Sequence, residues 1–387
     1  MSVSTAPVTV SRGLEGVVVA ETSICDVNGQ LGTYRYRQYD AIELAERLSL
    51  EEVWHLLFFG SLPTRQELDQ FLGQLRSLRQ LPYQLSGPVI RAAAAGAGDP
   101  MHAVRTATSL LAQTMDFGPA TESDPQELRK QTIQISALLP TLVAAVHRLR
   151  NGLQPIDPDP ALPQAANFLY MLDGRVPPAS NARKLEQYMI ITADHGMGAA
   201  TFAARVITST GADVGSAVTG ALGAFAGPLH GGAPSRVLDM LDSIGARDRV
   251  DPYLRDLISQ GGRVMGFGHR VYKTRDPRAL MLQRLVEELG CERLEFARHV
   301  ELRALELLAE LKPASRLCTN VEFYAALLLE EVGIPRELFT ATFAAGRIAG
   351  WSAHILEQAA ENRLIRPSTL FLGSDLERVP QGGRSQP

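Results

Sequence analysis

The sequence predicts a mainly α-helical protein with one small β-hairpin near its N-terminus. Helix-capping signals recur along the chain, and apolar residues follow helical periodicity over most of its 387 residues. There is no internal repeat, heptad array or alternation of strand and helix. The hydrophobic fraction of 45% and charged fraction of 21% are ordinary for a soluble globular protein. A chain of this length buries a large core, as two domains or as one domain with an insertion.

The predicted hairpin spans residues 17–36, where alternating residues flank the Asn28-Gly29 turn signal. Helices follow. Ser49-Leu50-Glu51-Glu52 and Thr64-Arg65-Gln66-Glu67 are capping boxes, in which the hydroxyl and the carboxylate satisfy unpaired amides reciprocally. Asp124 is a capping carboxylate before Pro125, and proline suits the first position of a helix.

Four prolines make residues 151–164 a loop or a stiff connector, and helical periodicity resumes at Ala166. Further helices are expected at about 184–194, 197–226, 233–243, 276–289, 292–311, 321–332 and 340–362. The stretch 197–229 is rich in small residues and contains Arg205 and Asp213. It is therefore expected to pack in an interior or a subunit interface rather than to span a membrane. We expect Pro380–Pro387 to be disordered.

Charge and cysteine content exclude several classes of protein. The formal net charge of −4 gives no case for nucleic acid or an anionic membrane as a partner. Cys25, Cys291 and Cys318 are few, odd in number and far apart, so neither a disulfide framework nor a zinc–cysteine site is indicated. The first twelve residues do not resemble a signal peptide. We therefore expect a cytoplasmic protein.

Three histidines stand in glycine-rich stretches: Asp194-His195-Gly196, Gly227-Pro228-Leu229-His230-Gly231-Gly232 and Gly266-Phe267-Gly268-His269-Arg270. Glycine lets a backbone and a ligand approach closely, so three such stretches suggest one pocket assembled from distant segments. Each histidine alone is more often a hydrogen-bonded core or turn residue. The basic residues of 261–279 around His269 favour an anion site instead; they are Arg263, Arg270, Lys273, Arg275 and Arg278.

Asn320-Val321-Glu322-Phe323-Tyr324 opens an apolar helix, with Asn320 as a plausible N-cap and Glu322 in the first turn. Taken alone, Glu322 is best explained as a carboxylate that compensates the helix dipole.

These stretches, followed by Gly346-Arg347-Ile348-Ala349-Gly350-Trp351-Ser352-Ala353-His354, resemble the citrate synthase family in order and spacing. The likeness extends from Gly13 to Ser368, nearly the whole chain. It implies a two-domain helical fold. Residues 1–231 and 334–387 would form a large domain for dimerisation and oxaloacetate binding, and residues 232–333 a small domain for coenzyme A and the catalytic base.

The resemblance also implies roles. His230 would hydrogen-bond the thioester carbonyl, Glu322 would remove the methyl proton, and His269 would polarise the ketone of oxaloacetate. His195, Arg278 and Arg347 would bind that substrate, joined by Arg366 from the neighbouring subunit of a homodimer with shared active sites. Arg270, Lys273 and Arg275 would hold coenzyme A, whose thioester is a substrate; no permanently bound cofactor and no metal are implied.

Two positions depart from the family pattern. Glu322 stands where most members carry aspartate, and Gly198 stands where they carry asparagine. Three alternatives to a citrate synthase remain: a 2-methylcitrate synthase acting on propionyl-CoA, a weakly active ligand-binding paralogue, and a histidine-liganded metallohydrolase. The last is the weakest, because the histidines lack helical HxxxH spacing.

Overall fold

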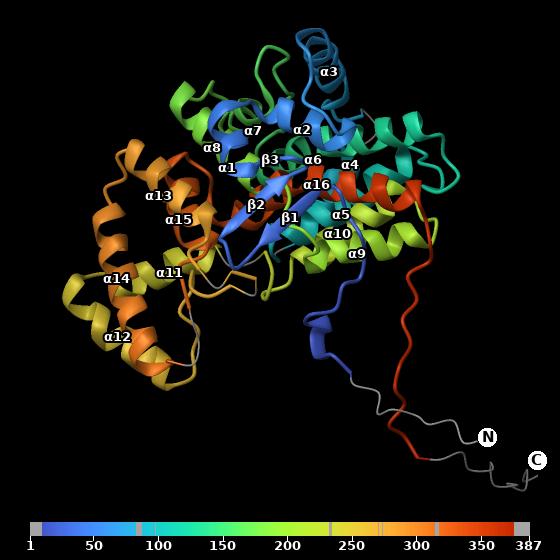
Figure 1. Ribbon diagram of the computed structural model, residues 1–387. Coiled ribbons are helices and arrows are strands. Elements are labelled where there is room, and N and C mark those ends of the chain that lie inside the picture. The colour runs from blue at the N-terminus through green and yellow to red at the C-terminus, as the bar shows by residue number, and fades with distance from the viewer. Residues whose placement is uncertain are drawn as a thin grey trace, which may run out of the picture.

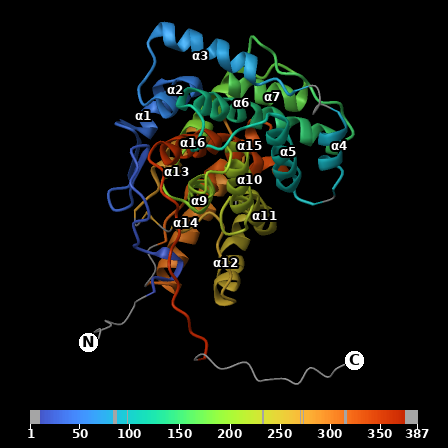
Figure 2. The same ribbon diagram turned by 90° about the vertical axis from the view of Figure 1, so that its right-hand side faces the viewer.

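In the computed structural model, which describes residues 10–82, 87–96, 98–231, 234–269, 271–272, 274–313 and 317–374, helices form a large body with a smaller group of helices beside it. Figure 1 shows α11 to α15 gathered at one side of the body formed by α1 to α10 and α16. In the view turned by 90°, α12 and α14 extend away from the body (Figure 2).

Sixteen α-helices occur in these ranges. In the body they are α1 (Ala41–Arg47), α2 (Leu50–Phe59), α3 (Arg65–Leu78), α4 (Pro88–Ala94), α5 (Pro100–Thr114), α6 (Pro125–Arg150), α7 (Gln164–Asp173), α8 (Ala179–Ile191), α9 (Ala199–Ser209), α10 (Val214–Phe225) and α16 (Phe339–Ala360). The side group contains α11 (Pro234–Ile244), α12 (Val250–Ser259), α13 (Pro277–Glu288), α14 (Leu294–Leu311) and α15 (Val321–Glu331). Short 3-10 turns lie at Arg12–Leu14, Arg247–Arg249 and Arg336–Leu338.

The hairpin predicted at 17–36 is confirmed within residues 25–36, while residues 17–24 form no strand. Strands β1 (Cys25–Asn28) and β2 (Thr33–Tyr36) pair antiparallel around a four-residue loop, and Asn28 Oδ1 accepts the N–H of Leu31 at 2.9 Å. Gly32 has φ +67°, a value that favours glycine. The short strand β3 (Tyr39–Asp40), which was not predicted, adds to the other edge of β2.

Helix starts follow the capping signals. Both predicted capping boxes, at Ser49 and Thr64, are formed, and the Asp124 carboxylate caps α6 with Pro125 in its first turn. The loop predicted at 151–164 separates α6 from α7.

The single helix predicted at 197–226 is wrong. The chain forms α9 and α10, separated by Gly211, which has φ +85°, and Asp213, whose carboxylate accepts the N–H of Ser216 at 2.9 Å. A left-handed glycine ends one helix and a capping carboxylate starts the next. Helix α12 was not predicted.

The core lies between α6 and α16, whose Ser136 and Ser352 hydroxyls are 2.9 Å apart. By length and composition alone, α6 could cross a membrane, but 78% of its most apolar window is buried inside the protein. It is therefore read as a core helix.

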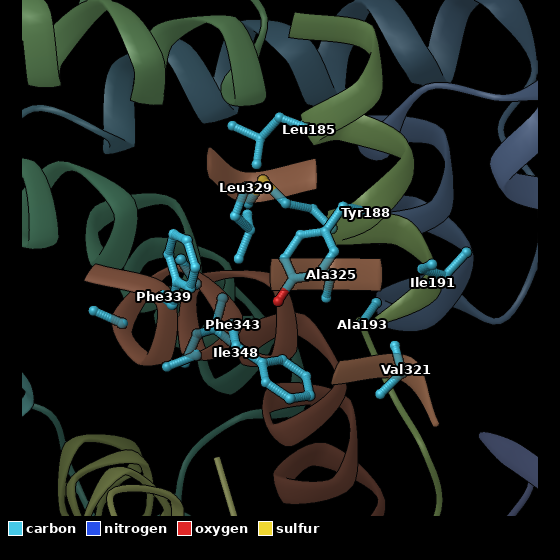
Figure 3. Packing of buried hydrophobic residues seen from close by; sticks show 14 of the residues in the cluster. Leu185, Tyr188, Ile191, Ala193, Val321, Ala325, Leu329, Phe339, Phe343 and Ile348 are labelled. Carbon is cyan, nitrogen blue, oxygen red and sulfur yellow. The ribbon is translucent and has the colours of Figure 1, made fainter. Parts of the chain in front are cut away.

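A second contact joins α8, α15 and α16. Figure 3 shows Tyr188 of α8 beside Ala325 of α15, with Phe343 of α16 below. This apolar junction holds together the helices that carry, or directly precede, several predicted site residues.

Cys25, Cys291 and Cys318 are free thiols. Pro380–Pro387 lie outside the described residues.

Candidate active site

The glycine-rich stretches of His195 and His269 lie together. Their ring centroids are 5.3 Å apart, and Tyr272 joins them: its ring centroid is 4.8 Å from that of His269, and its hydroxyl lies 3.1 Å from Nε2 of His195. Burial, followed by the charges of Arg278 and Arg347, lowers the pKa of His195 well below its ordinary value. His195 is therefore a neutral imidazole at physiological pH.

His230 lies in the turn after α10, against the ring of Phe225 at a centroid distance of 4.9 Å. Its Nε2 accepts the backbone N–H of Ala200 at 3.3 Å. Burial and the charge of Arg347 lower its pKa to about 4. A neutral imidazole has one N–H, so the proton is assigned to Nδ1, which can donate to a ligand.

His269 uses its other nitrogen for structure. Its Nδ1 accepts the backbone N–H groups of Val271 at 3.0 Å and of Tyr272 at 3.1 Å. In the neutral ring this assigns the proton to Nε2. The Arg278 guanidinium lies 3.4 Å from Nε2 and can only donate, so in this tautomer the two groups are neighbouring donors and not hydrogen-bond partners. Two N–H donors side by side suit an oxygen that becomes negatively charged.

The start of α13 fixes Arg278. Asp276 caps the helix and binds the guanidinium of Arg278 in a buried pair, with an Nη2 to Oδ2 distance of 2.8 Å. The same carboxylate oxygen accepts the N–H of Val321 at 3.2 Å. Asp276 therefore ties the arginine to the start of α15.

Glu322 lies in the first turn of α15, where Asn320 Oδ1 accepts its backbone N–H at 3.0 Å. Burial is the main cause that raises the pKa of Glu322 to about 7, and Arg278 opposes it. A carboxylate with this pKa is suited to taking a proton near neutral pH. Compensation of the helix dipole therefore does not by itself explain why Glu322 is buried with a raised pKa.

Beyond Asn320, a short antiparallel bridge between Phe267 and Thr319 joins the His269 loop to the segment before α15. Gly268 donates to the carbonyl of Cys318 at 2.8 Å. Gly266 has φ +85°, and a Cβ there would lie 2.8 Å from the Phe323 side chain. The family-like glycine is thus required for this close approach.

Glu301 of α14 supports the same segment from behind. This buried carboxylate accepts the hydroxyl hydrogens of Thr319 at 2.6 Å and of Tyr324 at 2.5 Å. It therefore holds the chain on both sides of Glu322.

A cavity of about 460 Å³ lies at the meeting point. His230, His269, Asn320 and Glu322 line it together with Phe267 and Leu317. Arg263 and Lys312 also line the cavity. Nothing in the sequence indicated that these two cations lie at the same cavity.

Arg347 of α16 is buried, and its Nε donates to the carbonyl of Thr192. Its guanidinium lies over the Phe343 ring, 5.1 Å from the centroid. Burial lowers the pKa of Arg347 below its ordinary value, and the charge of Asp194 opposes that effect, so the group stays a cation.

The remaining predicted residues lie elsewhere or outside the described ranges. Arg275 is exposed in the loop before α13, and Arg366 is exposed on the extended segment after α16. Arg270 and Lys273 lie outside the described residues. Gly198 precedes α9, and a Cβ built there would lie 3.9 Å from the His230 ring. The sequence did not single out Tyr272, Asp276 or Tyr34, whose ring centroid lies 5.6 Å from that of His195. Only Asp276 had a signal, the helix-capping pattern Asp276-Pro277.

Among the residues with described positions, no group of three or more histidine, cysteine, aspartate or glutamate side chains could hold a metal ion. Neutral imidazoles, a carboxylate with raised pKa and buried guanidinium groups define an enzyme site for acid–base chemistry on an anionic substrate.

The family model described as "Citrate synthase, C-terminal domain" matches residues 13–368. The citrate synthase of Synechocystis sp. is 38% identical over 96% of this chain and 94% of its own length. The 2-methylcitrate synthase of Mycobacterium tuberculosis is 39% identical over 96% of this chain and 92% of its own. The chain therefore belongs to the citrate synthase family, whose members are acyltransferases.

A solved structure extends the likeness to the fold. The citrate synthase of Thermoplasma acidophilum, in a ternary complex with carboxymethyl coenzyme A and oxaloacetate, superposes with a TM-score of 0.88 at 28% identity. The match covers 96% of this chain and 99% of that one.

Proposed function

We propose that the protein condenses acetyl-CoA with oxaloacetate and water to give citrate and CoA. The observation that carries the proposal is the shared cavity of His230, His269 and Glu322, in a chain that belongs to this family over nearly its whole length. The three side chains supply a base and two N–H donors, which this reaction needs at one place.

In this mechanism Glu322 removes a proton from the acetyl methyl group. His230 Nδ1–H donates to the thioester oxygen as it gains negative charge in the enol or enolate. The enol carbon then attacks the ketone of oxaloacetate, and His269 Nε2–H donates to the oxygen that becomes the alkoxide. Hydrolysis of the thioester releases citrate and CoA. Positioned donors of this kind lower the barrier because charge develops where they already point.

The buried cations fit the dicarboxylate substrate. Arg278 and Arg347 keep their charge at any working pH, and guanidinium groups bind carboxylates in a bidentate manner. His195 beside Tyr272 supplies a further hydrogen-bonding group. The coenzyme A thioester is a substrate, and its phosphates are assigned to Arg270, Lys273 and Arg275, with Arg263 and Lys312 at the same cavity.

The two groups of helices are assigned to two domains, residues 1–231 with 334–387, and residues 232–333, which close on the substrates. The functional unit is assigned as a cytoplasmic homodimer in which Arg366 enters the neighbouring site. Exposure of Arg366 in the single chain is compatible with that role.

A second candidate, 2-methylcitrate synthase, is favoured by the relative from Mycobacterium tuberculosis. One methylene in an apolar pocket changes selectivity by only about 1 to 3 kcal/mol, so shared motifs do not separate the two activities. The deciding experiment is thiol release with oxaloacetate and either acetyl-CoA or propionyl-CoA. A higher kcat/KM for acetyl-CoA supports the proposal, and a higher kcat/KM for propionyl-CoA selects the alternative.

The same assay tests turnover itself. If protein that binds both substrates releases no CoA thiol with either acyl-CoA, it is instead the ligand-binding paralogue to which Glu322 and Gly198 pointed.

A further inference from the structure

One face of α16 is directed at the turn that precedes His195. Arg347, Gly350 and His354 are spaced by three and four residues, so they share that face. A Cβ at Gly350 would lie 2.1 Å from the carbonyl oxygen of Ala193 and 2.6 Å from the Asp194 carboxylate. Glycine thus brings the helix backbone directly against the turn.

Asp194, which is fully buried, shapes this turn. Its Oδ1 accepts the backbone N–H of Gly196 at 2.6 Å, and Gly196 has φ +67°. The hydroxyl of Tyr36 donates to the Asp194 carbonyl at 3.1 Å. The carboxylate therefore fixes the chain after His195, while the Tyr36 hydroxyl contacts the backbone of Asp194 before it.

The other carboxylate oxygen faces His354. His354 Nε2 lies 3.0 Å from Asp194 Oδ2, off the direction of an ideal hydrogen bond, and neither atom has another hydrogen-bond partner in the described part of the chain. Both side chains have no solvent exposure. Because buried polar atoms are rarely left unpaired, each is the other's partner.

Arg205 determines which nitrogen of His354 carries the proton. Its guanidinium lies 3.0 Å from His354 Nδ1, and a guanidinium can only donate. Nδ1 is therefore the acceptor, and Nε2–H points to Asp194. His354 thus transmits a donor to the carboxylate while it remains a neutral ring.

The far end of this chain of contacts is anchored. Glu357 accepts from Arg205 at 2.7 Å, and Gln358 accepts from its Nε at 3.1 Å. Glu357 also accepts the backbone N–H of Ser23 at 2.8 Å. Each group in the series from Ser23 to Asp194 therefore has a fixed role as hydrogen-bond donor or acceptor and a fixed position.

We propose that His354 is a positioning residue for the dicarboxylate substrate: it holds Asp194, which shapes the His195 turn and balances the charge of Arg347. The inference rests on the proposed function. His354 touches no substrate itself, so its effect is on the binding of oxaloacetate rather than on the acyl-CoA.

The test compares two substitutions in the full-length protein. In His354→Asn the amide oxygen can still accept from Arg205, but the side chain is too short to reach Asp194. In His354→Gln the longer amide can accept from Arg205 and donate to Asp194. We expect His354→Asn to raise the KM for oxaloacetate at least about 10-fold, with the KM for acetyl-CoA changed less than about 2-fold. His354→Gln should recover most of the loss.

Ser352→Ala is the matched control, because it removes a buried hydrogen bond of α16 that is directed at α6. It should lower the Tm and leave the KM for oxaloacetate unchanged. If His354→Asn does not fold, Asp194→Asn is measured instead. The NH2 group of the new amide would face either His354 Nε2–H or the backbone N–H of Gly196, so one of these two hydrogen bonds would be lost.

An unchanged KM for oxaloacetate in the folded His354→Asn or Asp194→Asn protein would overturn the inference, as would an equal loss in His354→Gln. Binding of oxaloacetate to the wild-type protein, measured by calorimetry, distinguishes failure of this inference from failure of the proposed function. Wild-type protein that binds no oxaloacetate and releases no CoA thiol would overturn the proposed function, and this inference with it.

Discussion

Asn320 donates through Nδ2 to the carbonyl of Gly268, 3.0 Å away, while its Oδ1 caps the N–H of Glu322. One side chain therefore joins the loop of His269 to the helix of Glu322. A misplacement of about 1 Å in a reacting group can cost on the order of 100-fold in rate. In this protein the relative position of Glu322 and His269 is held by the Asn320 side chain, by backbone hydrogen bonds and by Glu301.

Glu322→Gln should lower kcat at least about 100-fold, the scale of a general base, and should leave oxaloacetate binding intact. Glu322→Asp, which keeps the charge and retracts the carboxylate by roughly 1.5 Å, should also lose activity, by up to about 100-fold. Because the base acts deprotonated, wild-type kcat/KM should rise with pH through about 7. Steady-state pH profiles check this; wild-type turnover in Glu322→Gln would remove the assignment.

The same residue makes a prediction about stability. A folded-state pKa of about 7, above the ordinary 4.5, favours the protonated carboxyl, so its stability contribution is complete below pH 4.5 and is lost as pH rises through 7. Glu322→Gln should therefore be more stable than wild type at pH 8, by roughly 3 kcal/mol, and nearly equal at pH 4.5. Urea unfolding at both values measures it. Glu67, whose pKa is lowered by hydrogen bonds from Thr64, provides the control of opposite sign.

Alanine at His230 or His269 should lower kcat by roughly 100- to 1000-fold. The two variants should differ in exchange of the acetyl methyl protons with solvent, measured by NMR with a nonreactive oxaloacetate analogue. Loss of His230 should block exchange, because the enol loses its donor. Loss of His269 should spare most of it, since that donor acts at the ketone. Equal exchange in both variants would contradict the division of roles.

Local rules predicted much of this architecture. Capping boxes marked helix starts at Ser49 and Thr64, and the turn signal at Asn28 marked the hairpin, because these patterns act over three or four residues. The break at Gly211 was missed because small apolar residues continue on both sides of it. Tyr272 could not be predicted, since its contact with His195 joins residues 77 apart in the chain and has no local pattern.

Gly29→Ala tests how the hairpin meets the His269 loop. A Cβ at Gly29 would lie 2.1 Å from the carbonyl oxygen of Val271, so the two segments must separate to admit it. We expect kcat/KM to fall at least about 10-fold because closure over the substrates is impaired. Gly73→Ala is the control: no atom lies within 4 Å of its added Cβ, and alanine in a helix should stabilise by about 0.5–1 kcal/mol. Full activity of Gly29→Ala would show that close contact between the hairpin and the His269 loop is not needed for closure over the substrates.

Arg366 provides the test of shared sites. It is exposed on the extended segment that leaves the end of α16 (Figure 1). If it binds the substrate of the neighbouring subunit, Arg366→Ala and Glu322→Gln proteins should each be inactive as homodimers. After subunit exchange, each heterodimer should hold one intact site, with Glu322 from the first variant and Arg366 from the second, while its other site carries both defects. Mixed samples should therefore recover activity in proportion to heterodimer content, measured by thiol release. Verified heterodimers without activity would show that Arg366 serves its own subunit or does not touch substrate.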